Sequence, residues 1–257
     1  MVKKARKDNK KLMLQAAGLT DIGRVRKNNE DSFLIEDPGN GKKSPYLICV
    51  VADGMGGQDY GEIASQMAIK TFHQEARQLT DSVDIVNWLN NSVLKTHLEV
   101  RRQLAHLQTS GMGSTLVAGI FTDQQCYIAN VGDSRAYLFR GGALYRQTKD
   151  HSLMEVMLDK GLIKPEEVYT HPRRGELTRY IGQPTDLEVD IYKVDNLKSG
   201  DVVLFCSDGL WEMVRDPDIA LALQTNSDPL DAATSLINKA NRSGGVDNVT
   251  AVIVSIS

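Results

Sequence analysis

The sequence is poor in cysteine, since its 257 residues contain only Cys49, Cys126 and Cys206. An odd number of thiols, each inside an apolar run, does not suit a disulfide framework and is typical of a reducing compartment. No apolar stretch approaches the ~20 residues that span a bilayer. The N-terminus has no apolar core like that of a secretory signal peptide. These absences predict a cytoplasmic protein without a membrane partner.

A strong charge imbalance is also missing, because the formal net charge is -3. A domain without a basic surplus gives no reason to expect nucleic acid as a partner. Linkers rich in proline, glycine or serine are absent, and so are internal repeats, so we expect one domain over residues 12–257. The basic residues 1–11 are expected to form a flexible tail, or else an arm that docks on an anionic partner.

Short apolar or alternating segments predict strands. Several are separated by only a few residues, as at the Gly141-Gly142 turn, so antiparallel pairing is expected. The expected strands are Leu12–Leu19, Ser32–Glu36, Tyr46–Ala52, Ser114–Phe121, Cys126–Asn130, Ala136–Arg140, Leu187–Val194, Val202–Cys206 and Val249–Ile256.

Two pairs of helices accompany these strands. The first pair has apolar stripes that begin at Ala64 and at Val86, and His97 on the second stripe is expected to be a core histidine. The later pair begins at Asp216-Pro217 and Asp228-Pro229, where an aspartate N-cap precedes a proline. Helix pairs separated by strands predict an α+β domain in which helices cover mainly antiparallel sheets.

Acidic residues recur at the ends of the predicted strands. Asp53-Gly54, Asp133 and Asp208-Gly209 follow strands, and Asp247 precedes the last one. Carboxylate and carbonyl oxygens select hard cations, here Mg²⁺ or Mn²⁺, and the absence of Cys/His spacing motifs argues against zinc. Each Asp-Gly pair also suits an ordinary turn. The spacing alone therefore leaves a metal cluster and a set of turns equally open.

A charged segment follows the first predicted strand. Arg26 stands just before Glu30 and Asp31. A guanidinium at this point suits bidentate binding of a phosphate, and the two acids suit the orientation of metal-bound waters. A charged surface loop explains the same residues without any function.

Taken together, six motifs resemble the metal-dependent serine/threonine protein phosphatases of type 2C, the PPM family, in their bacterial form. Each motif alone is weak evidence, but they occur in the family's order and cover nearly all of the chain. The motifs are Arg26 with Glu30-Asp31, Val51-Ala52-Asp53-Gly54-Met55-Gly56-Gly57, Gly111-Met112-Gly113-Ser114-Thr115, Asn130-Val131-Gly132-Asp133-Ser134-Arg135, Ser207-Asp208-Gly209-Leu210-Trp211 and Asp247-Asn248-Val249-Thr250.

The resemblance implies a four-layer α+β sandwich of two mainly antiparallel sheets, flanked on each side by a pair of antiparallel helices. It also implies a site for two Mg²⁺ or Mn²⁺ ions. Asp53 would bridge the ions, the carbonyl of Gly54 would bind one of them, and Asp208 and Asp247 would bind the other. Arg26 would bind the substrate phosphate.

Further roles follow from the same resemblance. Glu30 and Asp31 would hold waters behind the ions, and Asn248 is placed with them. Asp133 would join Asp208 in binding a third, weaker ion. Residues 152–182 resemble the family's mobile flap beside the site.

The chain departs from the family pattern at two places. Animal members carry a proton-donating histidine where this chain has Met55, and bacterial relatives usually have a histidine where it has Gln58. Methionine cannot donate a proton, so the general acid is not assigned, and a metal-bound water is the substitute that we expect. His151 matches a family motif and is interpreted as structural.

The resemblance implies hydrolysis of phosphoserine and phosphothreonine esters by a water activated between the two ions. We expect phosphorylated proteins as partners, substrates of a serine/threonine kinase, and a monomeric enzyme. A catalytically inactive scaffold that binds phosphoproteins is the alternative from another class, and the retained acids argue against it. A metal-dependent nuclease is a rival chemistry, which the lack of a basic stripe disfavours.

Overall fold

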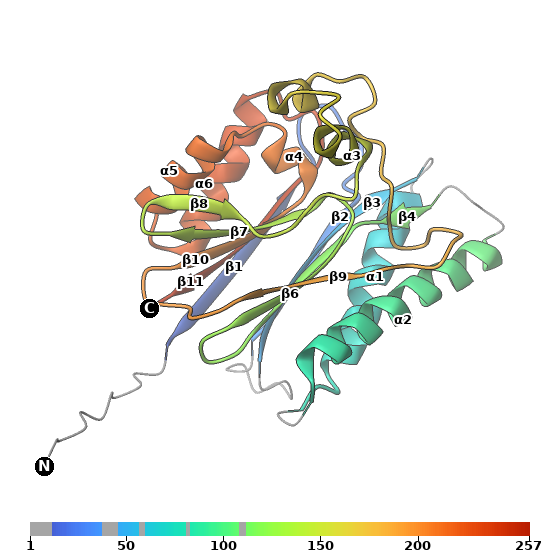
Figure 1. The fold of residues 1–257 in the computed structure, drawn as a ribbon, viewed down its shortest axis with the longest axis horizontal. Coiled ribbons are helices and arrows are strands. Elements are labelled where there is room, and N and C mark those ends of the chain that lie inside the picture. The colour runs from blue at the N-terminus through green and yellow to red at the C-terminus, as the bar shows by residue number, and fades with distance from the viewer. Residues whose placement is uncertain (1–11, 38–45, 57–59, 81–82, 108–111) are drawn as a thin grey trace, which may run out of the picture.

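The computed structural model describes residues 12–37, 46–56, 60–80, 83–107 and 112–257. The expected basic tail over residues 1–11 and the departure at Gln58 lie outside these residues. Within them, two β-sheets face each other at the centre of the molecule, and helices cover the outer face of each sheet (Figure 1).

The first sheet has the strand order β1-β11-β10-β7-β8, and every neighbouring pair is antiparallel. Its last strand along the chain, β11, lies between the first strand and β10, so both ends of the sequence enter one sheet. The strands are β1 (Leu14–Asp21), β7 (Arg135–Arg140), β8 (Ala143–Arg146), β10 (Val202–Cys206) and β11 (Val249–Ile256).

The second sheet has the order β2-β3-β5-β6-β9, with the short strand β4 paired to β3. Its pairs are antiparallel as well. The strands are β2 (Asp31–Glu36), β3 (Leu47–Met55), β4 (Gly113–Ser114), β5 (Leu116–Phe121), β6 (Cys126–Val131) and β9 (Asp190–Val194).

One antiparallel helix pair packs on each sheet (Figure 1). Helices α1 (Tyr60–Ala76) and α2 (Ile85–His106) cover the second sheet, and α5 (Asp216–Thr225) and α6 (Pro229–Arg242) cover the first. The described residues also form three shorter helices, which are α3 (Leu153–Asp159), the 3-10 helix η2 (Pro165–Tyr169) and α4 (Asp208–Trp211). No helix in the described part of the chain has the length and apolarity needed to cross a bilayer.

Three apolar cores hold the two sheets and the two helix layers together. One lies between the sheets, and the other two lie between each sheet and its helices. The inner layer is tightly filled at Gly119 of β5, where a Cβ atom would come within 2.2 Å of the Phe205 ring. Such close packing between layers fixes the separation of the sheets. The expected α+β four-layer sandwich is confirmed.

Several local predictions need correction. Strand β8 was not expected. It lies at the solvent-facing edge of its sheet, so Leu144 and Tyr145 do not form part of a clear alternation of buried and exposed residues. The strand expected over Leu187–Val194 begins only at Asp190. Asp216 is the first residue of α5 rather than its N-cap, which is Arg215. Asp228 does cap α6, accepting hydrogen bonds from two backbone N–H groups.

His97 is confirmed as a core histidine. Its side chain is 3% exposed, and Nδ1 accepts a hydrogen bond from the backbone N–H of Gly182 at 3.1 Å. Burial lowers the pKa of His97. The ring therefore fastens the end of the segment 152–182 to α2. Whether this segment acts as a flap, and whether residues 12–257 form one domain, stay predictions.

Candidate active site

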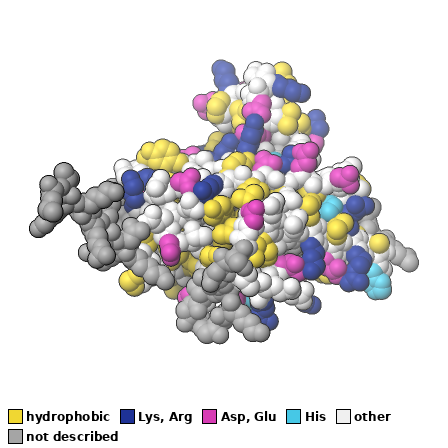
Figure 2. All heavy atoms as spheres, turned by 60° about the horizontal axis from the view of Figure 1, so that its bottom comes forward, with side chains coloured by type: hydrophobic (Ala, Val, Ile, Leu, Met, Phe, Trp, Pro, Cys, Tyr) yellow, Lys and Arg dark blue, Asp and Glu magenta, His cyan; other side chains and the backbone are white. Residues whose placement is uncertain are grey.

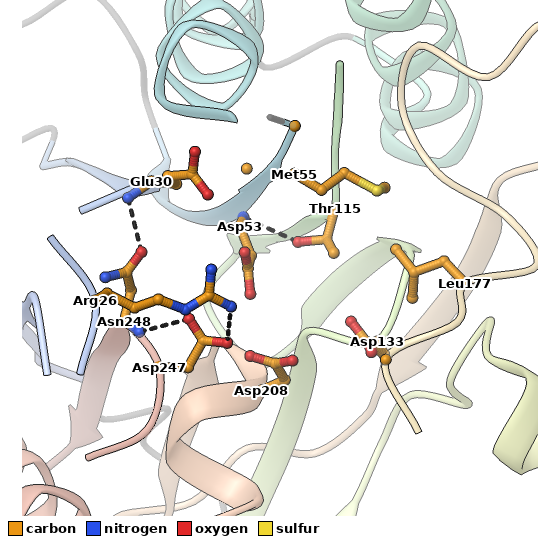
Figure 3. Close-up of a pocket in the computed structure, with 13 residues that line it drawn as sticks. Arg26, Glu30, Asp53, Met55, Thr115, Asp133, Leu177, Asp208, Asp247 and Asn248 are labelled. Atoms are coloured by element: carbon orange, nitrogen blue, oxygen red, sulfur yellow. Dashed lines mark hydrogen bonds and ion pairs between the residues drawn. The ribbon is translucent and has the colours of Figure 1, made fainter. Parts of the chain in front are cut away.

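Four aspartates from separate strand ends face one cavity of about 220 Å³ (Figure 3). Asp53 lies near the end of β3, and Asp133 lies in the turn between β6 and β7. Asp208 starts α4 directly after β10, and Asp247 precedes β11. Arg26 lines the same cavity from the loop between β1 and β2. The structure thus brings together the five side chains that the sequence nominated for metal and phosphate binding.

Arg26 and Asp247 are paired in this structure. The Nη2 atom of Arg26 donates to Oδ2 of Asp247 at 2.6 Å, and the backbone N–H of Asn248 donates to Oδ1 at 2.8 Å. The guanidinium remains about half exposed. Arg26 is therefore accessible to solvent. It can bind an incoming anion either while it keeps its hydrogen bond to Asp247 or after that bond breaks.

Asn248 fastens the Arg26 loop to the site. Its Oδ1 accepts from the backbone N–H of Glu30 at 2.8 Å, and its Nδ2 donates to the carbonyls of Ile22 and Asn28 at 3.0 and 2.9 Å. The amide thus uses both its acceptor and its donors. Because these bonds span more than 200 residues of sequence, Asn248 holds the loop that carries Arg26 and Glu30.

Asp31 lies beneath the cavity and is 6% exposed. Its Oδ2 accepts hydrogen bonds from the hydroxyls of Ser207 and Thr250, each at 2.7 Å. In the β2–β3 register Asp31 is the partner of Asp53. Burial raises the pKa of Asp31 to about 6, although the two hydroxyls lower it.

The carboxylates of the cavity oppose one another electrostatically. Burial raises the pKa of Asp53 well above its ordinary value, and the charges of Asp31 and Asp208 add to the rise. Burial likewise raises the pKa of Asp208, followed by the charges of Asp133 and Asp247. Concentrating ionised carboxylates in a buried site costs free energy that a bound cation offsets.

Asp133 is held by its surroundings on β7 and α4. Its backbone carbonyl accepts a hydrogen bond from Nε1 of Trp211 at 3.0 Å. Burial raises the pKa of Asp133 to about 7, with a further rise from Asp150 and an opposing effect of Arg135. The Arg135 guanidinium stacks 3.5 Å over the Trp211 ring. Helix α4, which Asp208 begins, is thereby fixed against the Asp133 turn.

The cavity wall away from Arg26 is apolar. Leu177 lies there next to Asp133, and Met55 lies beside Thr115 (Figure 3). Leu177 belongs to the segment 152–182 and forms an antiparallel bridge with Ser152. A substrate whose anionic group binds Arg26 would therefore extend past the carboxylates and contact this apolar wall.

His151 is structural in this arrangement. Its Nδ1 accepts from the backbone N–H of Gly132 at 3.1 Å, and its carbonyl accepts from Thr178 at 2.8 Å. Burial lowers the pKa of His151, with a further fall from Arg179. It does not line the cavity, so it connects the Asp133 turn to the segment 152–182 rather than acting on a bound ligand.

The donor set fits hard divalent cations. Oδ1 of Asp208 and Oδ1 of Asp31 are buried and have no hydrogen-bond partner among the described residues. At Gly54 a Cβ atom would lie 2.0 Å from the carbonyl oxygen of Gly61, so only glycine permits the backbone to pass there. An unsatisfied buried carboxylate oxygen is costly without a positive partner.

The side chains do not form a finished metal cage. No three His, Cys, Asp or Glu side chains of the described residues converge on a single point. Asp247 is instead paired with Arg26. A site with few protein ligands suits a hydrated hard cation such as Mg²⁺ or Mn²⁺, since waters can complete the coordination.

Residues that the sequence reasoning missed support the acids from behind. Ser207, Thr250 and Trp211 bind Asp31 or Asp133, and Thr115 binds the backbone of Asp53. All four lie within motifs that carried the family resemblance, but the sequence analysis gave none of them a role of its own. Their position within the motifs was the available signal.

Comparison with known proteins decides the family. The model described as "Protein phosphatase 2C" matches residues 16–155, which is more than half of the chain. The chain belongs to the protein phosphatase 2C family. A serine/threonine phosphatase stp of Listeria monocytogenes is 38% identical over 91% of this chain and 93% of its own length. The protein phosphatase PhpP of Streptococcus pneumoniae is 34% identical over 93% and 96%.

Solved structures of the family agree. The serine/threonine phosphatase of S. agalactiae superposes with a TM-score of 0.88, at 31% identity, over 95% of this chain and all of that one. The catalytic domain of the phosphatase PstP, solved with two manganese ions, gives a TM-score of 0.84 at 33% identity over 95% and 99%. The expected bacterial, metal-dependent serine/threonine protein phosphatase is confirmed as the class of this enzyme.

Proposed function

We propose that the chain hydrolyses phosphoserine and phosphothreonine esters in proteins at the cavity lined by Asp53, Asp133, Asp208 and Asp247. The observation that carries this proposal is the convergence of these acids with Arg26 on one cavity (Figure 3). The relatives named as serine/threonine phosphatases support the substrate class. The phosphoproteins would be substrates of a serine/threonine kinase.

Two Mg²⁺ or Mn²⁺ ions fit the core of the site. Asp53, the carbonyl of Gly54, Asp208 and Asp247 would hold them. Asp133 and Asp208 would hold a third ion more weakly. When bound, such ions activate a water as the nucleophile at neutral pH and supply positive charge to the phosphoryl oxygens. The structure of PstP with two manganese ions supports the two core positions.

The protein's own groups bind and orient the substrate. Arg26 would hold two phosphoryl oxygens through its planar guanidinium, which needs no proton transfer. Glu30 and Asp31 would accept hydrogen bonds from water at the site and orient it. Met55 and Leu177 would exclude bulk water from the leaving-group side. Met55 cannot protonate the leaving oxygen, so we expect a water held at the cation site, rather than bulk water, to be the proton source.

No side chain of the cavity serves as a nucleophile. None of the described residues that line it is a serine, cysteine or histidine. The hydroxyl of Thr115 is already bound to the backbone of Asp53 and to Ser134. All three cysteines are buried, and burial raises the pKa of each thiol above its ordinary value. Because the cavity aspartates are assigned to the cations, we expect direct attack by water, without a phosphorylated enzyme.

Several further expectations belong to the proposal. We place the reaction in the cytoplasm, because three free and buried thiols suit a reducing compartment. On the face in Figure 2, basic and acidic side chains intermingle and form no basic stripe among the described residues, which argues against nucleic acid. A monomer and the absence of a membrane partner complete the proposal. An inactive scaffold is disfavoured because all four aspartates are retained.

The proposal predicts hydrolysis of a phosphothreonine peptide and of an aryl phosphate with added Mn²⁺, and none with EDTA. The measurement is phosphate release by the full chain, with DNA as a parallel substrate. Binding of the phosphopeptide without release would establish the scaffold instead. Cleavage of DNA would establish the nuclease.

Arg26→Ala is expected to raise KM for a phosphopeptide by about tenfold or more, since a charged hydrogen bond contributes roughly 1.5–3 kcal/mol. The value of kcat is expected to fall less, because the guanidinium pairs with phosphate before and during the reaction. The matched control is Arg24→Ala, which removes the same charge two residues earlier, outside the cavity lining. An unchanged KM would show that Arg26 does not contact the phosphate.

A further inference from the structure

Thr115 binds Asp53 through both its backbone and its side chain. Its backbone N–H donates to the carbonyl of Asp53 at 2.8 Å, and its hydroxyl oxygen accepts from the backbone N–H of Asp53 at 3.0 Å. Thr115 lies between β4 and β5, which both pair with β3, and its side-chain bond to Asp53 takes the place of a backbone bond in that ladder. Both backbone polar groups of Asp53 therefore bind Thr115, which is 2% exposed, and the carbonyl also accepts from the Ser114 hydroxyl at 3.0 Å.

The same hydroxyl reaches the turn that carries Asp133. Thr115 Oγ1 and Ser134 Oγ share a hydrogen bond of 2.7 Å, and Ser134 is fully buried. On the other side of Asp133, Gly132 has φ +103° and would place a Cβ atom 2.6 Å from the Thr115 methyl carbon. The Thr115 side chain thus contacts both neighbours of Asp133. Hydrogen bonds therefore connect Asp53 through Thr115 to Ser134, which is the chain neighbour of Asp133.

We infer that Thr115 and Ser134 are positioning residues that set the separation between Asp53 and Asp133. This inference rests on the proposed function, in which Asp53 belongs to the core cation pair and Asp133 to the weaker third cation. The two carboxylates repel each other, and the hydroxyl bridge resists that repulsion before a cation arrives. Groups that orient metal ligands typically contribute about 10–100-fold to metal affinity.

The two hydroxyls are expected to contribute unequally. Loss of the Thr115 hydroxyl releases the backbone N–H of Asp53 and the link to Ser134, so the core and third sites both weaken. Loss of the Ser134 hydroxyl leaves the bond between Thr115 and Asp53 in place. Ser134→Ala is therefore expected to weaken the third site alone. This division distinguishes positioning from a general loss of stability.

Conservative substitutions at Thr115 can separate the effect of its hydroxyl group from that of its methyl group. Thr115→Val keeps the side-chain volume and the backbone bond to Asp53 and removes only the hydroxyl. Thr115→Ser keeps the hydroxyl and removes the methyl group. Thr96→Val is the matched control, because Thr96 is also fully buried and its hydroxyl binds a backbone carbonyl, that of Ser92, within α2.

The experiment is calorimetric titration of each full-length variant with Mn²⁺, with electron paramagnetic resonance of the bound ion as a second readout. Thr115→Val is expected to raise the Kd of the core sites about tenfold or more, while Thr115→Ser stays within about threefold of the parent. The Mn²⁺ concentration for half-maximal hydrolysis of an aryl phosphate should rise in parallel. Most of kcat should return at saturating metal. Thr96→Val should bind Mn²⁺ like the parent.

Each result has a distinct meaning. A parent protein that binds no Mn²⁺ overturns the proposed function itself. A parent that binds, together with a folded Thr115→Val variant of equal affinity, overturns the positioning role alone. Equal losses of affinity in Thr115→Val and Thr96→Val would also overturn it, since stability would then explain both. If Thr115→Val does not fold, an unchanged third site in Ser134→Ala overturns the inference.

Discussion

Asp208→Asn is expected to reduce turnover by about 10³-fold or more at saturating Mn²⁺ while the fold survives. In the proposed mechanism Asp208 contributes to a core ion and to the third ion, and removal of its charge weakens both. A bound cation supplies several kcal/mol of transition-state stabilisation, and each ~1.4 kcal/mol changes the rate tenfold. Steady-state hydrolysis of an aryl phosphate over a Mn²⁺ titration measures this loss. Activity equal to that of the parent would refute the assigned role.

The same substitution is expected to stabilise the protein in EDTA. Burial raises the pKa of Asp208 well above its ordinary value of 3.8, so burying this carboxyl destabilises the folded state near neutral pH. Asparagine removes this charge. The gain should shrink as the pH falls from the raised pKa toward 3.8, because the parent carboxyl then becomes protonated. Thermal unfolding in EDTA at neutral and acidic pH tests this trend.

Asp228→Asn provides the control for both measurements. Asp228 caps α6 and lies outside the cavity lining, and asparagine caps a helix about as well as aspartate. The control is expected to change neither turnover nor its dependence on Mn²⁺. A similar loss in both variants would indicate an effect of the Asp-to-Asn exchange that is unrelated to the site.

Asp133→Ala is expected to remove the weak third site, keep the two tight sites and reduce turnover by about 10²-fold or more. Asp133 shares its proposed ion with Asp208 alone, so waters must complete the coordination. Few charged ligands give Mg²⁺ a low affinity, because that ion gives up its water reluctantly. Calorimetric metal titration and turnover, measured on the same preparation, test this expectation.

The contrary interpretation is that Asp133 only caps the turn between β6 and β7. In that case Asp133→Ala would leave all metal sites and the rate unchanged. Asp195→Ala is a suitable control, since Asp195 is a half-exposed carboxylate that pairs with Lys193 away from the cavity. Loss of the tight sites in Asp133→Ala would contradict our assignment in another way, since it would place Asp133 in the core.

Local sequence patterns predicted most of the elements because the layers bury their apolar faces completely. The segment Leu47–Val51 is almost entirely buried, and its unbroken run of apolar residues predicted a central strand. Strand β8 lies at an edge and has half its residues exposed, so no such pattern marks it. The break at Thr115 between β4 and β5 was also missed, because it is produced by bonds to Asp53 rather than by local preference.

The acids of the site were recognised one by one, since each follows or precedes a strand and most adjoin a glycine. Their motifs and order also indicated the family, which the comparisons confirm. What the spacing left open was whether these acids meet. Any one Asp-Gly pair equally suits a turn, and neighbouring antiparallel strands end at opposite edges of a sheet.

The sequence by itself therefore determined the α+β class, the acids at the strand ends and the family. The tertiary structure decided which strand ends share an edge, and it paired Arg26 with Asp247 across 221 positions. It also decided the support behind the acids, where Asn248, Thr115 and Trp211 each bind residues that are distant in sequence. The physical reason is that periodicity reports which face of an element is buried. The partner that a buried polar group meets depends on sheet order and register, which no local pattern contains.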